Sequence, residues 1–256
     1  MNISRKKLLL EICTASFEDC LTAQTGGADR VELNTALALG GLTPSLGLLR
    51  EARPALHIPI IVMIRPRPAG FCYSASEFLV MQRDVEIALA HGADGIAFGI
   101  LHEDGSIDRA RCEHVARLAE GKTIVFHRAF DVTPEPFAAI EQLIDLGVTR
   151  VMTSGQESNA YNGAANITRF RRHANGRLEI LPAGGLNRFT IADVLARTGC
   201  EQVHASLTMT KHEPSTRARP HIRFGSVGAS EEQYTATQLE AVQTLRRLLD
   251  EWTMIA

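Results

Sequence analysis

Short apolar runs alternate along this chain with longer stretches in which apolar residues recur every three or four positions. Short apolar runs are typical of buried strands, and the three-to-four spacing is typical of helices that cover a core with one face. We predict strands at 8–13, 60–65, 123–127 and 178–183. We predict helices at 16–26, 45–53, 76–91, 108–120, 134–146, 163–175, 188–197 and 231–252.

A glycine followed by a short step and an apolar run marks four further strands. The four copies are Gly27–Leu33, Gly92–Phe98, Gly147–Thr153 and Gly199–Ala205. Glycine is common just past a helix C-terminus because it adopts a positive φ at little cost. Each copy therefore marks a place where a helix ends and a strand begins.

Eight strands alternating with eight helices is the count of a (β/α)8 barrel of the TIM type. A length of 256 residues suits one such domain over 1–256. A doubly wound open sheet is the alternative, but its usual glycine-rich loop is missing after the first strand, where the chain reads Cys13-Thr14-Ala15-Ser16-Phe17. We expect 206–230 to form a long loop after the eighth strand.

Composition excludes some classes of protein. The formal net charge of −2 argues against binding to nucleic acid or to an anionic membrane. No segment approaches the roughly 20 apolar residues of a membrane-spanning helix. The five cysteines are odd in number and lack CxxC spacing, which fits reduced thiols in a cytoplasmic protein.

Ionisable side chains stand near the ends of several predicted strands. In a barrel the loops that follow the strands meet at one edge, the C-terminal rim, where active sites lie. We predict Glu11 or Glu32 as a base and His127 as an acid, with Asp131 or a neighbouring group orienting the ring. The alternative is that the carboxylates pair with arginines and that His127 is a buried neutral histidine.

Three arginines follow strands at the same rim: Arg65, Arg67 and Arg128. A guanidinium binds carboxylate or phosphate through two parallel hydrogen bonds, so we predict that they clamp a small anionic metabolite. Polar or small residues after the later strands, with one arginine of the long loop, complete the predicted anion site: Ser154, Gly155, Gly184, Gly185, His204 and Arg223. The alternative for the 206–230 loop is a solvated segment that touches no ligand.

Metal sites are a further possibility at this rim. Two thiols fall on rim segments, Cys13 and Cys72, and thiolates are the ligands that Cu(I) prefers. A zinc or iron site would instead use His127, His204, Glu11 and Glu32. No spacing in the sequence requires either site.

Motifs along nearly the whole chain carry a family resemblance. They include Glu11-Ile12-Cys13, Gly27 to Leu33, Gly40-Gly41-Leu42-Thr43-Pro44-Ser45, Arg65-Pro66-Arg67, Phe71-Cys72-Tyr73-Ser74, Phe126 to Asp131 and Thr153-Ser154-Gly155. They resemble the CutC family, which is named for copper homeostasis. The resemblance implies a TIM-type barrel, a cytoplasmic location, homo-oligomers and a role in copper tolerance, but it implies no established reaction.

One departure from the family pattern bears on function. The family commonly has cysteine where this chain has Asn34, which weakens the case for a thiolate copper site. The first hypothesis is therefore an acid/base and anion-binding site for a small metabolite, with proton transfer as its chemistry. The second is a Cu(I)-binding protein using Cys13 and Cys72, and the third is an interaction scaffold whose rim residues bind nothing.

Overall fold

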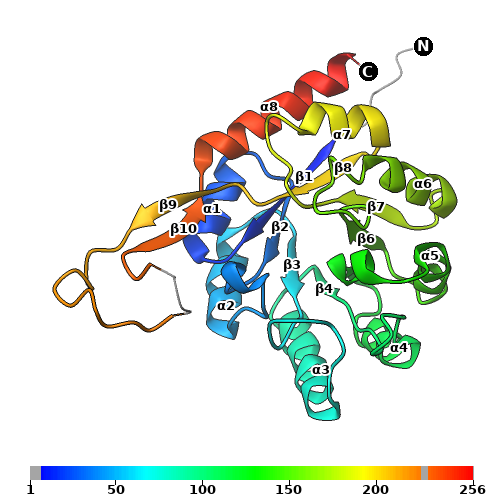
Figure 1. Cartoon of the computed structure of the whole chain (residues 1–256), viewed down its shortest axis with the longest axis horizontal. Helices are drawn as coiled ribbons and strands as arrows, with labels where there is room; N and C mark the ends of the chain where they lie inside the picture. The colour runs from blue at the N-terminus through cyan, green and yellow to red at the C-terminus, as the bar shows by residue number, and fades with distance from the viewer. Residues whose placement is uncertain (1–6, 226–229, 256) are drawn as a thin grey trace.

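The computed structural model describes residues 7–225 and 230–255, and its main sheet curls into a barrel of parallel strands (Figure 1). The strands are β1 (Leu9–Thr14), β2 (Arg30–Leu33), β3 (Ile60–Met63), β4 (Gly95–Phe98), β5 (Thr123–Phe126), β6 (Arg150–Thr153), β7 (Glu179–Pro182) and β8 (Gln202–Ala205). Neighbours pair in order from β7 back to β1 and on to β8. A bridge between Ala183 and His204 links the end of β7 to β8, so the predicted (β/α)8 barrel is confirmed.

Helices cover the outside of the barrel (Figure 1). They are α1 (Phe17–Thr25), α2 (Leu46–Ala55), α3 (Ala75–Ala90), α4 (Arg109–Leu118), α5 (Pro136–Asp145), α6 (Ala164–Ala174), α7 (Ile191–Thr198) and α8 (Leu239–Ile255), with short 3-10 turns at Leu37–Leu39 and Arg128–Val132. Four helices begin after a residue whose side chain accepts a backbone N–H of the first turn: Ser16, Ser45, Ser74 and Asp108. These caps satisfy donors that a helix start leaves unpaired.

Side chains along each strand alternate between the helices and the barrel interior, as the pleat of a strand requires. On β1, Leu10 and Ile12 belong to the large core under the helices, whereas Glu11 contacts His204 inside the barrel. Inward residues from β3 to β7 and the residue that follows β7 form a small apolar cluster: Ile61, Met63, Ala97, Val125, Met152, Leu181 and Ala183. Inward residues of β1, β2 and β8 are polar or carry sulfur: Glu11, Cys13, Arg30, Glu32, Gln202 and His204. Near the C-terminal rim the interior therefore has an apolar side and a polar side, whereas Arg150 of β6 and Glu179 of β7 add charged groups at the N-terminal end.

The segment between β8 and α8 corrects two predictions. Residues 208–212 and 233–237 form an antiparallel pair, β9 (Thr208–His212) and β10 (Gln233–Thr237), which projects away from the barrel (Figure 1). The predicted 206–230 loop thus contains a strand, and the predicted helix over 231–252 starts only at Leu239. The alternating β-branched residues of Tyr234-Thr235-Ala236-Thr237 favour the pair over a helix. Residues 226–229 of that loop lie outside the described residues.

Within residues 7–225 and 230–255, none of the helices is long and apolar enough to cross a membrane. The single-domain assignment over 1–256 stays a prediction.

Candidate functional site

A cavity of about 370 Å³ opens at the C-terminal rim of the barrel. It is lined by residues from the ends of β1, β2, β3, β5, β6 and β8 and from the loops that follow them. The lining residues are Cys13, Glu32, Asn34, Leu37, Gly40, Met63, Arg65, Phe71, His127, Arg128, Asp131, Val132, Met152 and His204. We call this cavity the rim pocket.

Arg65 brings a buried positive charge to the rim pocket. Its guanidinium donates to three backbone carbonyls, those of Leu39 and Gly41 at 3.0 Å each and that of Ala69 at 2.5 Å. No carboxylate within the described chain forms an ion pair with it, and its Nε–H has no hydrogen-bond partner there. Carbonyl dipoles hold the side chain in place without neutralising its charge, so the group is suited to attract an anion.

His127 provides a second donor beside Arg65. Its Nδ1 accepts the backbone N–H of Ala129 at 3.1 Å, which leaves the proton of the neutral ring on Nε2, and Nε2 is buried and unpaired in the described structure. Burial and the neighbouring Arg65 charge lower the pKa of His127 to about 3. Phe71 packs against both groups, 5.0 Å from the His127 ring and 5.3 Å from the Arg65 guanidinium carbon. The neutral ring is therefore favoured and offers the N–H of Nε2 as a donor, and the role of His127 as an acid stays a prediction.

Gly99 allows His127 to occupy this position. A Cβ atom on residue 99 would lie 2.5 Å from Cε1 and 2.6 Å from Nδ1 of the His127 ring. The glycine follows β4 directly, so the neighbouring strand leaves room for the ring that ends β5.

Glu32 and Asn34 form the opposite side of the rim pocket. The Asn34 amide donates to Oε2 of Glu32 at 2.9 Å, while Oε1 of Glu32 and Oδ1 of Asn34 are buried without a partner in the described residues. Burial, with Glu11 nearby, raises the pKa of Glu32. Nε2 of His204 lies 3.9 Å from Oε2 of Glu32. Burial opposes protonation of His204, but the Glu32 and Glu11 carboxylates raise its pKa overall.

Glu11 lies beneath the rim pocket and does not line it. Its carboxylate contacts the Arg30 guanidinium on one side and Nδ1 of His204 on the other, the latter at 2.7 Å. Burial works against the charge, but Arg30 and then His204 outweigh it and hold the pKa of Glu11 far below its usual range. The Arg30 ion pair thus holds Glu11 as a carboxylate outside the lining of the rim pocket, and its role as a base stays a prediction.

Asp131 and Arg128 form a separate, self-satisfied cluster at the edge of the rim pocket. Asp131 accepts from Nε of Arg128 at 2.8 Å and from Thr153, Ser154 and Gln156. None of these bonds reaches His127, so Asp131 does not orient that ring as predicted. Arg128 also donates to the Ser154 hydroxyl at 2.8 Å, and its partly exposed side chain lines the rim pocket.

The structure places the other predicted anion-binding residues outside the rim pocket. The backbone N–H of Ser154 donates to Asp131, and that of Gly155 donates to the Thr153 hydroxyl. A Cβ on Gly155 would lie 2.3 Å from the Gly163 carbonyl oxygen. Gly184 borders Arg128 but, like Gly185, does not line the cavity. Arg67 pairs with Glu77 and lines a neighbouring hollow, and Arg223 is exposed on the segment between β9 and β10. The residues after β6 and β7 lie close to the strand ends without lining the cavity, and the role of all these positions in anion binding stays a prediction.

The two thiols predicted for Cu(I) are not brought together. Cys13 lines the rim pocket, whereas Cys72 is exposed in the hollow that Arg67 lines. Instead, Cys13, Glu32 and His204 place one ligand atom each within 4.8 Å of one another. Burial and then the Glu32 charge raise the pKa of the Cys13 thiol well above its usual range.

The sequence analysis does not predict several residues in or beneath the rim pocket. Arg30 lies beneath it, in a motif that predicts only a helix-to-strand junction, and Asn34 lines it at a position where the family commonly has cysteine. Met63 and Met152 point inward from apolar strands. The usable signal was the period-two alternation of each strand, since Arg30, Glu32 and Asn34 occupy every second position.

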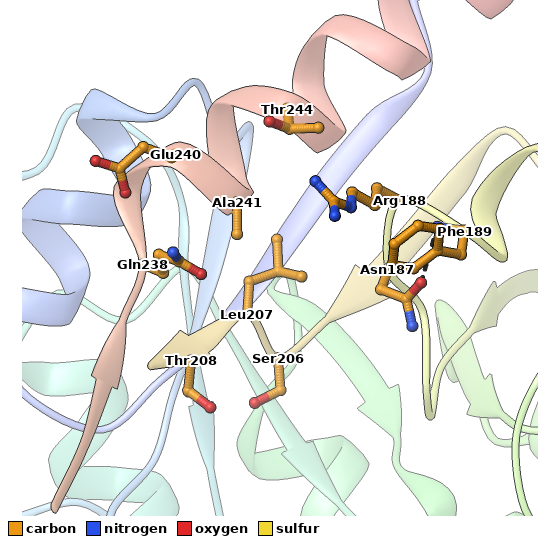
Figure 2. Close-up of a pocket in the computed structure, with 10 residues that line it drawn as sticks. All are labelled: Asn187, Arg188, Phe189, Ser206, Leu207, Thr208, Gln238, Glu240, Ala241 and Thr244. Atoms are coloured by element: carbon orange, nitrogen blue, oxygen red, sulfur yellow. Dashed lines mark hydrogen bonds between the residues drawn. The ribbon is translucent and has the colours of Figure 1, made fainter. Parts of the chain in front are cut away.

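A second cavity, of about 450 Å³, lies between the loop after β7, the start of β9 and the first turns of α8 (Figure 2). Figure 2 shows Leu207 and Ala241 near its centre, between Arg188 and Phe189 on one side and Gln238 on the other. Arg188 and Phe189 are both exposed, and the guanidinium carbon of Arg188 lies 4.5 Å from the centre of the Phe189 ring. None of the buried unpaired polar atoms found in the described residues belongs to its lining, so the rim pocket is the stronger candidate site.

Comparison with known proteins agrees with this barrel. The sequence model of the CutC family matches residues 8–209. The chain belongs to the CutC family. That match ends within β9, so most of the projecting pair and α8 lie beyond the family model.

Relatives of this family member span bacteria and mammals. A CutC family protein of Treponema denticola is 47% identical over 220 residues, which are 86% of this chain and 89% of that protein. The human copper homeostasis protein cutC homolog is 38% identical over 241 residues, which are 94% of this chain and 88% of that protein. A solved CutC structure from Streptococcus agalactiae has a TM-score of 0.74 at 34% identity and covers 77% of this chain and 97% of its own.

More distant structures share the fold alone. Thiamine phosphate pyrophosphorylase from Pyrococcus furiosus has a TM-score of 0.58 at 15% identity, covering 95% of this chain and 96% of its own. Because function resides in sites and not in folds, this similarity carries no substrate to the family member.

Proposed function

We propose that the rim pocket binds a small anionic metabolite and moves a proton on it. The observation that carries this proposal is that four of the eight buried side-chain polar atoms without partners in the described chain belong to residues that line this cavity: Nε of Arg65, Nε2 of His127, Oε1 of Glu32 and Oδ1 of Asn34. Buried polar groups are nearly always hydrogen-bonded in folded proteins, because leaving one unpaired costs about 1–3 kcal/mol. Four of them around one cavity are best explained by a ligand that pairs with them.

The two sides of the rim pocket would take different ends of that ligand. Arg65 and His127 offer only N–H donors at the unpaired positions, one of them charged, and would hold a carboxylate or phosphate oxygen. Asn34 offers an acceptor on the opposite side and would hold a hydroxyl or amine. The matching ligand carries an anionic group at one end and a hydrogen-bond donor at the other, in a volume of about 370 Å³.

Glu32 and His204 would carry the proton in this scheme. Burial raises the pKa of Glu32, while the Glu32 and Glu11 carboxylates overcome burial and raise the pKa of His204, so the pair shares a proton that either member can hold. Such a pair can take a proton from a carbon next to the anionic group and return it elsewhere, as in an isomerisation or a lyase reaction. The donors on the other side would stabilise the negative charge that develops.

Ligand screening tests the proposal. A panel of phosphorylated and carboxylated metabolites is titrated against the parent, Glu32→Gln and His127→Phe, with binding read by thermal shift and calorimetry. We expect a member of the panel to bind the parent at one site and to bind His127→Phe about 10–100-fold more weakly, since hydrogen bonds to charged groups contribute about 1.5–3 kcal/mol. Glu86→Gln on the exposed face of α3 is the matched control for the Glu32 variant.

Equal binding to the parent, Glu32→Gln and His127→Phe would contradict the proposal, as would a panel in which no anion binds. Loss of binding in Glu86→Gln would show that the charge change, and not the position of Glu32, is responsible.

Cu(I) is the second candidate for the same pocket, and it would be cargo in the copper homeostasis after which the relatives are named. The specific observation in its favour is the Cys13, Glu32 and His204 cluster, with the thioethers of Met63 and Met152 in the same lining. Thiol, thioether and imidazole groups are the ligands that Cu(I) prefers. Cys13 and His204 would hold the ion, and Cys72 would take no part.

A competition titration separates the two candidates. Reduced protein is titrated with Cu(I) under anaerobic conditions against a competing chelator, using Cys13→Ser and its matched control Cys72→Ser. If copper is the cargo, Cys13→Ser loses tight stoichiometric binding and Cys72→Ser keeps it. Binding that both variants retain would exclude the rim pocket as the copper site. A cytoplasmic location and homo-oligomers stay predictions.

A further inference from the structure

A hydrogen-bonded chain of polar side chains runs through the barrel interior below the rim pocket. It begins with Arg150, whose Nε donates to Oε2 of Glu179 at 2.8 Å, and Gln202 donates to the same oxygen at 3.0 Å. Gln202 accepts from Nη2 of Arg30 at 2.7 Å, and Nε of Arg30 donates to Glu11. Arg30, Arg150, Glu179 and Gln202 are the first residues of β2, β6, β7 and β8, so the chain is anchored at the N-terminal end of the barrel.

The two oxygens of Glu11 have different partners. Oε2 accepts from Nε of Arg30, and Oε1 lies 2.7 Å from Nδ1 of His204. Arg30 can only donate, and its ion pair with Glu11 leaves that group a carboxylate that can only accept. Nδ1 of His204 must therefore carry a proton, because an unprotonated nitrogen facing a carboxylate oxygen would repel it.

The other nitrogen of His204 faces the rim pocket. The charged and titratable groups around the ring are Glu11 and Cys13 from β1 and Arg30 and Glu32 from β2. Nε2 lies 3.9 Å from Oε2 of Glu32, and His204 is only 8% exposed. Whatever the ring exchanges with the pocket passes through Nε2.

We propose that Glu11, anchored by Arg30, is a positioning residue that fixes the tautomer of His204 and makes Nε2 its one working nitrogen. The inference rests on the proposed function only in taking the rim pocket as the ligand site. It applies to either candidate, because the same nitrogen would exchange a proton with a metabolite or ligate Cu(I). The buried charges of Arg30 and Glu11, which do not line the rim pocket, thereby gain a role.

Nitrogen-15 NMR of histidine-labelled protein tests this assignment without any ligand. In the parent at neutral pH, Nδ1 of His204 should show the chemical shift of a protonated nitrogen. In Glu11→Gln, the amide oxygen turns to the Arg30 guanidinium and the amide N–H₂ faces His204. Nδ1 must then accept, so the proton moves to Nε2 in most molecules.

Two further variants serve as controls for Glu11→Gln. Glu11→Asp keeps a carboxylate and should restore the parent tautomer, which a merely space-filling role for residue 11 would not do. Glu179→Gln removes the same charge from the same hydrogen-bonded chain without touching His204, and should leave the tautomer unchanged.

An unprotonated Nδ1 in the parent would overturn the inference, as would a Glu11→Gln variant that keeps the parent tautomer. If Glu11→Gln does not fold, the parent spectrum alone decides. A panel in which no anion binds would sink the proposed function and leave this assignment standing, so the two failures can be told apart.

Discussion

His127 shows how a few contacts decide what one residue can do. A histidine at a strand end is normally a candidate proton shuttle, because its pKa lies near neutrality. Here Nδ1 accepts the backbone N–H of Ala129, Arg65 adds a positive charge nearby, and the residue is 3% exposed. The sequence predicted where this residue lies but not its protonation, since the guanidinium beside it comes from a different strand.

The lowered pKa of His127 predicts an acid sensitivity. An unfolded histidine binds its proton near pH 6.5, whereas folded His127 binds one only near pH 3, so the unfolded state holds more protons between these values. Stability from this group is complete above about pH 6.5 and falls as the pH drops toward 3. In His127→Phe the slope of unfolding free energy over this window should shrink by up to about 1.4 kcal/mol per pH unit.

Denaturant unfolding at several pH values measures this slope. The control is His102→Phe, which removes a histidine whose side chain is 56% exposed. A parent and a His127→Phe variant with the same slope would show that His127 does not stay neutral in the fold.

At the scale of elements, the strands explain which parts of the fold the sequence predicted correctly and which it did not. The glycine junctions and apolar runs located all eight barrel strands because burial on both faces demands apolar residues. The same patterns misread 231–252, where β10 precedes α8, because the two-stranded pair projects from the barrel and has no core to set its periodicity. Inward-pointing charges such as Arg30 were visible, but their partners lie on strands far away in the sequence.

The buried ion pair between β1 and β2 should contribute much more to the free energy of unfolding than an exposed ion pair does. Arg30→Met leaves Glu11 buried without its main partner, and breaking such a pair costs about 3–5 kcal/mol. Arg83→Met removes an exposed pair on α3, with side chains 73% and 44% exposed, and should cost at most about 1 kcal/mol. Guanidinium-induced unfolding of the parent and both variants gives the comparison. Equal losses would mean that water reaches the Arg30 and Glu11 pair.

At the scale of the whole molecule, the barrel separates its interior into functions. Arginine and carboxylate groups bind one another at the N-terminal end, and four unpaired donors and acceptors line the rim pocket at the other end. The family resemblance and the fold followed from motifs along the chain. The sequence did not predict that the rim pocket has a donor side, formed by Arg65 and His127, and an acid side, formed by Glu32 and His204. That division depends on which hydrogen bonds are already satisfied within the fold.

The most direct test of this account follows the ring signals of the histidines during titration. The probe is the phosphorylated or carboxylated acid from the panel that most raises the melting temperature. The account predicts that one ligand shifts His127 on the donor side and His204 on the acid side together, with the same affinity, while exposed His102 in the neighbouring hollow does not move. A ligand that shifts only His102, or shifts neither pocket histidine, would contradict the claim that the rim pocket is the functional site.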